Sequence, residues 1–109
     1  YQEIEVVCRN AYNFVAWGQA EKGDLETYKQ IASDSIKANA GAFRVSFGMG
    51  EFADLLQKVG DAYLECKDYA ELVELSKKIH LYGSRMFYWL DSMIPWAKIS
   101  ENFNSIMNL

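Results

Sequence analysis

The chain has 109 residues, a length that fits one domain with a real hydrophobic core but not two domains. Half of its residues are hydrophobic, which excludes an intrinsically disordered chain. Its formal net charge of −4 argues against nucleic-acid binding, because the phosphate backbone needs a basic face.

Two helices are predicted in the N-terminal part of the chain. The first covers residues 2 to about 19. The second starts after an N-cap at Asp24 and ends near residue 38, where Asn39 and Gly41 are expected to stop it. Apolar residues recur at helical spacing in both segments, and the expected inward positions are Ile4, Val7, Cys8, Ala11, Phe14, Val15, Gly18, Leu25, Tyr28, Ile31, Ala32 and Ile36.

The segment from residue 42 to 47 alternates between apolar and polar side chains, as a strand does, but an isolated strand has no partner here. We expect either an ordered loop held by Phe43 and Phe47 or a continuation of helical structure through the segment. A third helix is predicted from about residue 50 to residue 66, and its inward positions are Phe52, Leu55, Leu56, Val59 and Tyr63.

The start of a fourth helix is marked by Asp68, a good N-cap, with Glu71 three residues later, as in a capping box. Gly83 is expected to end this helix in the left-handed conformation. The last turn would then hold cationic side chains, which suit the helix dipole: Lys77, Lys78 and His80. The inward stripe consists of Leu72, Leu75, Ile79 and Tyr82.

A fifth helix is predicted after a cap at Ser84, and Pro95 is expected to end or kink it. A last apolar stripe follows at Trp96, Ile99, Phe103 and Ile106. The predicted fold is a single all-α domain over residues 1–109. Its five or six helices form an antiparallel bundle or a short stack of helical hairpins.

The third and fourth helices carry a family resemblance. Part of the segment resembles a tetratricopeptide repeat, whose pattern G-x-x-Y … G-D-Y-x-E-A is matched by Gly60, Tyr63, Asp68, Tyr69 and Glu71. The sequence departs from that pattern at Lys67 and at Leu72, where the family has glycine and alanine. The resemblance implies a scaffold of stacked helical hairpins that binds proteins.

A second likeness lies in the same region. The segment from Lys67 to Leu75, followed by an amphipathic helix, looks like phasins, helical proteins that coat storage granules. This likeness implies a chain that covers an apolar surface.

Three patterns invite a chemical interpretation, and we assign catalysis to none of them. His80 is the only histidine, and Gly83 follows it by three residues rather than the four of histidine phosphotransfer domains. The G-x-G-x-x-A pattern from Gly48 to Ala53 lacks the βαβ unit that dinucleotide binding needs. Cys8 and Cys66 fit no zinc or redox spacing. We therefore expect a protein that is not an enzyme and that has no cofactor and no metal site.

The segment from residue 82 to 96 is the candidate contact surface. Five large apolar residues run consecutively from Met86 to Leu90, so they point in several directions around a helix and cannot all face one core. Aromatic residues left outside typically mark a binding surface. The predicted partner-binding residues are Arg85, Phe87, Tyr88, Trp89 and Trp96.

These observations predict a non-catalytic protein-interaction or assembly module, whose partner is another protein or a second copy of the chain. The alternative is a bundle that binds an apolar small molecule or coats an apolar granule or membrane surface. The alternative draws on the four methionines, which suit a deformable apolar pocket. Neither a signal peptide nor a membrane-spanning apolar run is visible, and we expect a cytoplasmic location.

Overall fold

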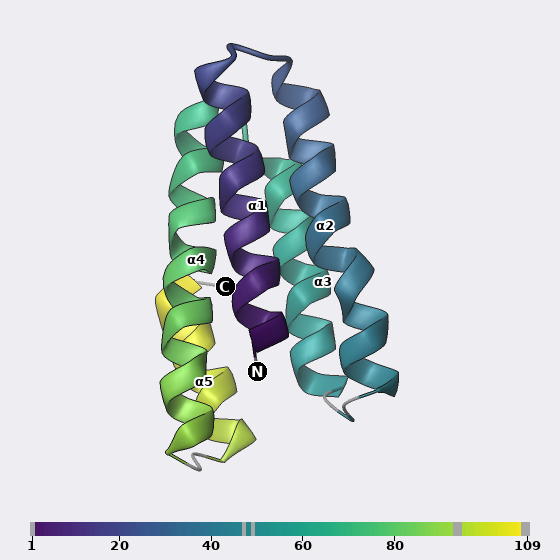
Figure 1. Ribbon diagram of the computed structural model, residues 1–109, viewed down its shortest axis with the longest axis vertical. Helices are drawn as coiled ribbons and strands as arrows, with labels where there is room; N and C mark the ends of the chain where they lie inside the picture. Colours follow the sequence, from purple (N-terminus) through teal and green to yellow (C-terminus); the bar gives the residue numbers. More distant parts are fainter. Residues whose placement is uncertain (1, 47, 49, 93–94, 108–109) are drawn as a thin grey trace.

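Apolar residues at helical spacing produce five α-helices in the described part of the computed structural model (Figure 1). The structure describes residues 2–46, 48, 50–92 and 95–107. Within these ranges, the side chains of residues 2–4, 86–91, 96, 100, 106 and 107 lie outside the description. The helices are α1 (Gln2–Ala20), α2 (Leu25–Val45), α3 (Gly50–Glu65), α4 (Tyr69–Asp91) and α5 (Trp96–Met107). The all-α prediction is confirmed.

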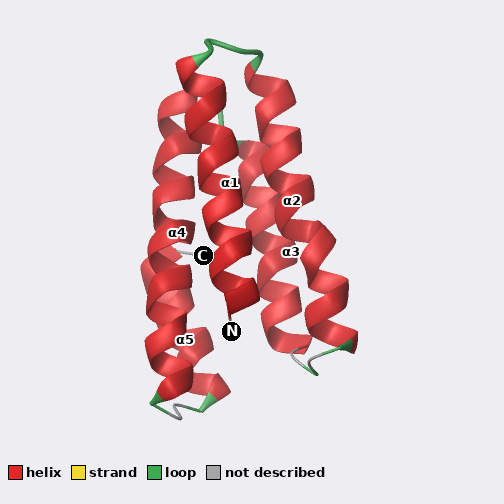
Figure 2. Cartoon of the chain, viewed as in Figure 1, coloured by secondary structure: helices red, strands yellow, loops and turns green. Residues whose placement is uncertain are grey.

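The first four helices run side by side along the long axis and alternate in direction, and turns and loops connect them (Figures 1 and 2). Helix α1 packs between α2 and α4, α3 packs on α2, and α5 packs against α4. The resulting bundle measures 41 by 24 by 22 Å. Short turns, such as residues 21–24, explain the antiparallel order of neighbouring helices.

A row of aromatic rings crosses the core and ties four helices together. Phe43 of α2 meets Phe52 of α3 edge to face, with the ring centroids 5.0 Å apart. Phe52 lies 6.1 Å from Tyr82 of α4, and Tyr82 lies 4.4 Å from Phe103 of α5, centroid to centroid. All four side chains are buried. The row therefore fixes α5 onto the bundle through direct aromatic contacts.

The N-cap predicted at Asp68 is confirmed, because the backbone N–H of Glu71 donates to the Asp68 carboxylate over 2.9 Å. The return bond of the predicted capping box is shifted by one residue. The Glu71 carboxylate accepts over 2.7 Å from the backbone N–H of Lys67, the residue before the cap, rather than from that of Asp68. The stripe that follows faces inward as predicted, with Leu72, Ile79 and Tyr82 buried and Leu75 half-buried.

The predicted end of the second helix at Asn39 and Gly41 is wrong, because α2 continues to Val45. The continuation buries Phe43, which is only 3% exposed, against the third helix. Asn39 is accommodated by donating from its amide to the backbone carbonyl of Ser35, one turn earlier. Arg44 pairs with Asp54 of α3. Of the two alternatives for residues 42–47, the helical one holds as far as Val45, and Phe47 lies outside the described residues.

The predicted boundary between the fourth and fifth helices at Gly83 and Ser84 is also wrong, because α4 runs through both to Asp91. Ser84 does not cap a helix. Its hydroxyl donates to the carbonyl of His80 over 3.4 Å, an i to i−4 contact of a helix interior. Lys77, Lys78 and His80 therefore lie in the middle of α4 rather than in its last turn, where the helix dipole would favour them.

Candidate functional site

Helix α1 has a buried side and an uncovered side. Val7, Cys8, Ala11 and Val15 face the core and are buried, as predicted. Phe14 was also expected to face inward, but it is 41% exposed, so that prediction is wrong. Successive helical residues are rotated by about 100°, and Phe14 therefore lies well away from the direction of its buried neighbour Val15.

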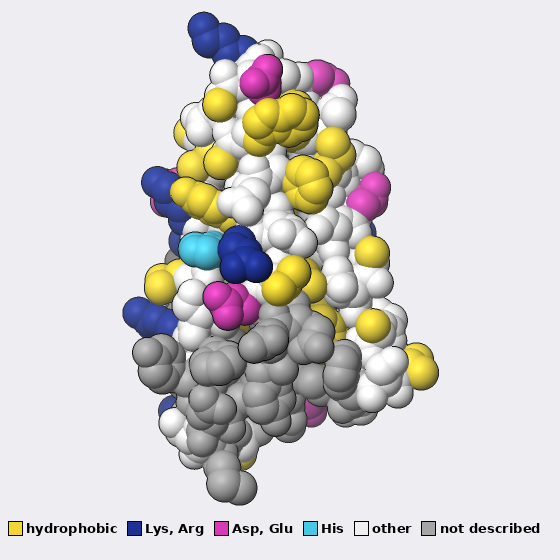
Figure 3. Space-filling model, viewed as in Figure 1, with side chains coloured by type: hydrophobic (Ala, Val, Ile, Leu, Met, Phe, Trp, Pro, Cys, Tyr) yellow, Lys and Arg dark blue, Asp and Glu magenta, His cyan; other side chains and the backbone are white. Residues whose placement is uncertain are grey.

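The other side carries a stripe of exposed residues, and in the described part of the chain Trp17 alone of these makes a ring contact with another helix. We define the α1 outer stripe as Val6, Asn10, Asn13 and Trp17, with Phe14 on its flank. Val6 is 39% exposed and Trp17 is 58% exposed. The two asparagines, Phe14 and Trp17 line a shallow, open depression. Hydrophobic side chains gather on the same face of the molecule, over the upper half of α1 (Figure 3).

Most of the α1 outer stripe lies in a segment without charge, and only Val6, next to Glu5, is outside that segment. From residue 10 to residue 20 the sequence contains no Asp, Glu, Lys or Arg, although 24% of the whole chain is charged. A solvent-exposed helix face usually carries charged side chains. Charge depletion together with exposed aromatic residues is typical of the centre of a protein–protein interface.

Trp17 projects from a well-supported position. Its ring meets Tyr28 of α2 edge to face, with the centroids 5.9 Å apart. The Tyr28 ring in turn fills the space that side chains at Gly18 and Gly23 would occupy. The Tyr69 hydroxyl donates to the carbonyl of Gly23 over 2.7 Å and links this turn to α4. A side chain ordered in this way loses less conformational entropy on binding.

The contact surface predicted from the sequence is placed only in part. Arg85 lies on α4 and is exposed. The side chains of Phe87, Tyr88, Trp89 and Trp96 lie outside the described residues, although their backbone belongs to α4 and α5. This surface therefore stays a prediction. The α1 outer stripe was missed, and the available signal was the charge-free run with Trp17 outside the inward pattern.

The histidine and the two cysteines have structural surroundings. The His80 ring stacks on Tyr12 of α1 with the centroids 5.1 Å apart, and both side chains are half-buried. Cys8 and Cys66 are free and buried. Burial, with the Glu5 carboxylate as a second cause, raises the pKa of the Cys8 thiol to about 12. Burial also raises the pKa of Cys66. Both thiols are therefore protonated at neutral pH and poorly nucleophilic.

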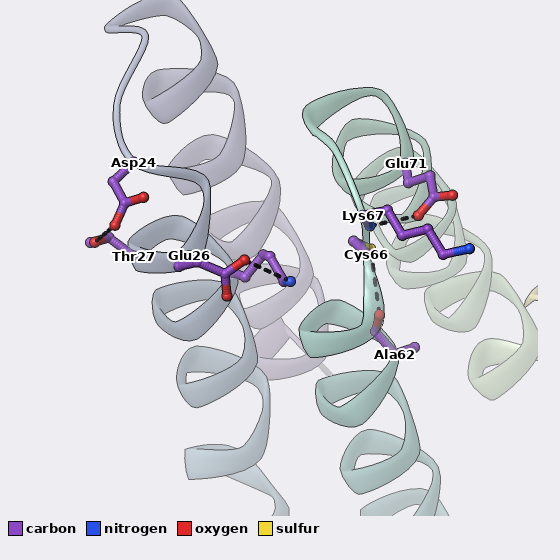
Figure 4. A network of polar contacts seen from close by, with 8 residues as sticks. Asp24, Glu26, Thr27, Ala62, Cys66, Lys67 and Glu71 are labelled. Carbon is purple, nitrogen blue, oxygen red and sulfur yellow. Dashed lines mark hydrogen bonds and ion pairs between the residues drawn. The ribbon is translucent and has the colours of Figure 1, made fainter.

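Polar contacts gather at the end of the bundle that holds the two interhelical turns (Figure 4). The Thr27 hydroxyl donates to Asp24 over 2.8 Å. Lys29 is a buried residue, 8% exposed, and its ammonium donates to Glu26 over 3.2 Å. The Cys66 thiol lies 3.4 Å from the carbonyl of Ala62. Each contact joins residues within one helical turn, so this cluster fixes helix ends rather than forming a site.

The described residues contain no group of three or more His, Cys, Asp or Glu side chains placed to hold a metal ion. Within the same part of the chain, no helix combines the length and the apolar character needed to cross a membrane.

Comparisons with known proteins give no match, whether with family models, with curated proteins or with solved structures. The likenesses to tetratricopeptide repeats and to phasins therefore stay predictions.

Proposed function

We propose that the chain is a non-catalytic protein-interaction module that binds a protein partner through the α1 outer stripe. The observation that carries the proposal is Trp17, an aromatic side chain 58% exposed in the segment from residue 10 to 20, which contains no charged residue. Tryptophan is among the residue types that dominate binding energy at protein interfaces.

The stripe has the composition of an interface centre with a polar margin. A buried aromatic side chain removes about 150–250 Å² of surface from water. Asn10 and Asn13 are exposed beside Trp17, and each amide can donate and accept hydrogen bonds. A partner can thus bury the indole ring while the two amides replace their bonds to water. The aromatic segment of α4 and α5, with Arg85, offers a second contact surface in this proposal.

The proposal can be tested by placing a photo-crosslinking amino acid, p-benzoylphenylalanine, at position 17 in cells that express the chain. The matched control carries the same probe at Gln57, an exposed position of α3. We expect a discrete protein adduct from position 17 that excess unlabelled chain competes away, and none from position 57. Equal adducts from both positions would contradict the proposal. Lipid adducts from position 17 would instead favour the coating of an apolar surface.

A pair of substitutions provides a second test with the same logic. Trp17→Ser removes the exposed indole, whereas Leu64→Ser removes an apolar side chain that is 37% exposed on α3. Only the first change should abolish the adduct formed by a second probe at Asn13. Loss of the adduct in both variants would show a general effect of reduced surface hydrophobicity.

A further inference from the structure

The structure leads us to propose that the partner of the α1 outer stripe is the same stripe of a second copy, in an antiparallel helix pair around a two-fold axis. This inference deepens the proposed function and rests on it. Its first support is the spacing of the stripe. Val6, Asn10, Asn13 and Trp17 are separated by four, three and four residues, which is the a/d spacing of a coiled-coil seam.

Helix α1 already uses the same spacing on its inner side. Cys8, Ala11, Val15 and Gly18 follow one another at three, four and three residues, and all four are buried in the bundle. Helix α1 therefore presents one seam to α2 and α4, and a second seam to the outside. All four residues of the outer seam are exposed in the described structure, so the outer seam has room for another helix.

The order of residues in the outer seam is self-complementary. Read from either end, it is apolar, amide, amide, apolar. In an antiparallel pair, a positions of one helix face d positions of the other. That arrangement places Trp17 against Val6 of the second copy and Asn10 against Asn13 of the second copy. The large indole then meets a small side chain, and each amide meets an amide that can both donate and accept.

Charge also favours a second copy over a partner of opposite charge. The chain carries a formal net charge of −4, so two copies repel each other wherever their charged faces meet. The run from residue 10 to 20 has no charge. The charged residues near Val6 are Glu5 and Arg9, and in the antiparallel pair they lie opposite this uncharged run, so like charges are not opposed. An antiparallel pair also sets the two helix dipoles in the favourable opposed sense.

The contact can extend beyond the four seam residues. Phe14 lies on the flank of the α1 outer stripe and is 41% exposed. A stable interface buries about 800 Å² on each partner, so a stable pair needs such flanking contacts as well as the seam itself.

The association is tested by sedimentation velocity of the full chain over a range of concentrations. We expect a reversible dimer whose dissociation constant rises by about 30-fold or more in Trp17→Ser, the change typical of losing a hot-spot aromatic residue. Asn13→Lys, which puts a charge in the seam without removing an apolar contact, should have a similar effect. The matched controls Leu64→Ser and Asn104→Lys, at exposed positions of α3 and α5, should dimerise as the wild type does.

The orientation of the two α1 helices is tested by oxidative crosslinking of chains in which one of the two asparagines is replaced by cysteine. The native Cys8 and Cys66 are buried. An antiparallel pair predicts that a mixture of Asn10→Cys and Asn13→Cys chains forms more disulfide-linked dimer than either variant alone. A parallel pair predicts the opposite, because each position would then face itself. The second result would overturn the proposed geometry.

Three outcomes separate this inference from the proposed function. A wild-type chain that stays monomeric at every concentration overturns the second-copy inference, and the proposed function survives only if position 17 still crosslinks to a different protein. A dimer that Trp17→Ser and Asn13→Lys leave intact shows that another surface joins the copies, and it overturns the inference. A dimer lost in both variants, each with an unchanged helical circular dichroism spectrum, supports it.

Discussion

Gly83 of α4 packs against Cys8 of α1 so closely that a Cβ atom at position 83 would lie 2.9 Å from the Cys8 Cβ and 3.0 Å from its Sγ. Real side chains do not approach to such distances, so the absence of a side chain at Gly83 sets how near α1 and α4 can come. Both residues are buried. Gly83 is therefore a packing residue in the middle of a helix and not the end of one.

Replacing Gly83 by alanine should destabilise the protein, although alanine is the better helix former. The added methyl group must push α1 and α4 apart, at a cost of about 1–3 kcal/mol. The matched control is Gly41→Ala, because Gly41 lies in α2 with nothing near its missing Cβ. That change should stabilise the protein by about 0.5–1 kcal/mol. Urea unfolding of the two variants measures both effects, and a stabilised Gly83→Ala would contradict the assigned packing role.

These two glycines show which part of the fold the sequence could predict. Hydrophobic periodicity gave the inward stripe of α4 correctly, because a stripe is a local property of one helix. A glycine near the end of such a stripe can either end the helix or allow a neighbouring helix to pack closely against it. The choice at Gly83 depends on Cys8, which lies far away in the sequence. The same reason explains why Asn39 and Gly41 were wrongly expected to end α2.

Asp68→Ala should cost more stability than Asp24→Ala, although both residues precede a helix. The Asp68 carboxylate accepts from the backbone N–H of Glu71, whereas Asp24 makes no side-chain bond to the helix backbone and accepts from the Thr27 hydroxyl. Losing a cap that pairs with the backbone costs typically about 1 kcal/mol. Urea midpoints of the two variants compare the costs. Equal losses of stability in the two variants would mean that the hydrogen bond from the Glu71 N–H to Asp68 does not stabilise the helix.

The candidate site shows a different limit of sequence reasoning. Phe14 fits the inward pattern of α1 as well as Val15 does, and only the packing of α2 and α4 around the helix decides which of them is covered. Trp17 lay outside that pattern, so its exposure was open to prediction. The consecutive aromatic residues from Phe87 to Trp89 drew the prediction towards α4 instead. The composition of a chain can show that it has more apolar surface than its core can bury, but not where on the fold that surface lies.

Phe103→Ala should detach α5 from the bundle or unfold the protein. Phe103 is 1% exposed and is the last ring of the aromatic row, 4.4 Å from Tyr82. Truncating a buried phenylalanine costs about 3–5 kcal/mol. Asn104→Ala, at the neighbouring exposed position of the same helix, is the control and should change stability little. Thermal unfolding followed by circular dichroism compares the two, and equal midpoints would show that α5 contributes little to the core.

The buried thiol of Cys8 should make the stability of the protein fall at alkaline pH. Burial raises the pKa of Cys8 from 9.0 to about 12 in the folded chain. Below pH 9 the thiol is protonated in both the folded and the unfolded chain, so its contribution to stability is fully present. As the pH rises from 9 towards 12, the unfolded chain loses this proton while the folded chain keeps it. The free energy of unfolding should therefore fall by up to about 1.4 kcal/mol per pH unit for this one group.

Urea unfolding under reducing conditions at pH 8, 9 and 10 measures this slope. Burial also raises the pKa of Tyr63 and Tyr82 above 10.0, so these tyrosines add to the slope as the pH approaches 10, and the difference between the wild type and Cys8→Ala isolates the thiol. Cys8→Ala removes the thiol and should flatten the slope by the share of one proton, while Cys66→Ala serves as the comparison because burial raises the pKa of that thiol as well. The sign of the change in the free energy of unfolding with pH decides the test. Two results would contradict this prediction: a wild-type stability that rises between pH 9 and 10, or a slope that is unchanged in Cys8→Ala. Either result would mean that the folded chain does not keep the Cys8 thiol protonated. The close packing of Gly83 on Cys8 would then not exclude solvent from the thiol.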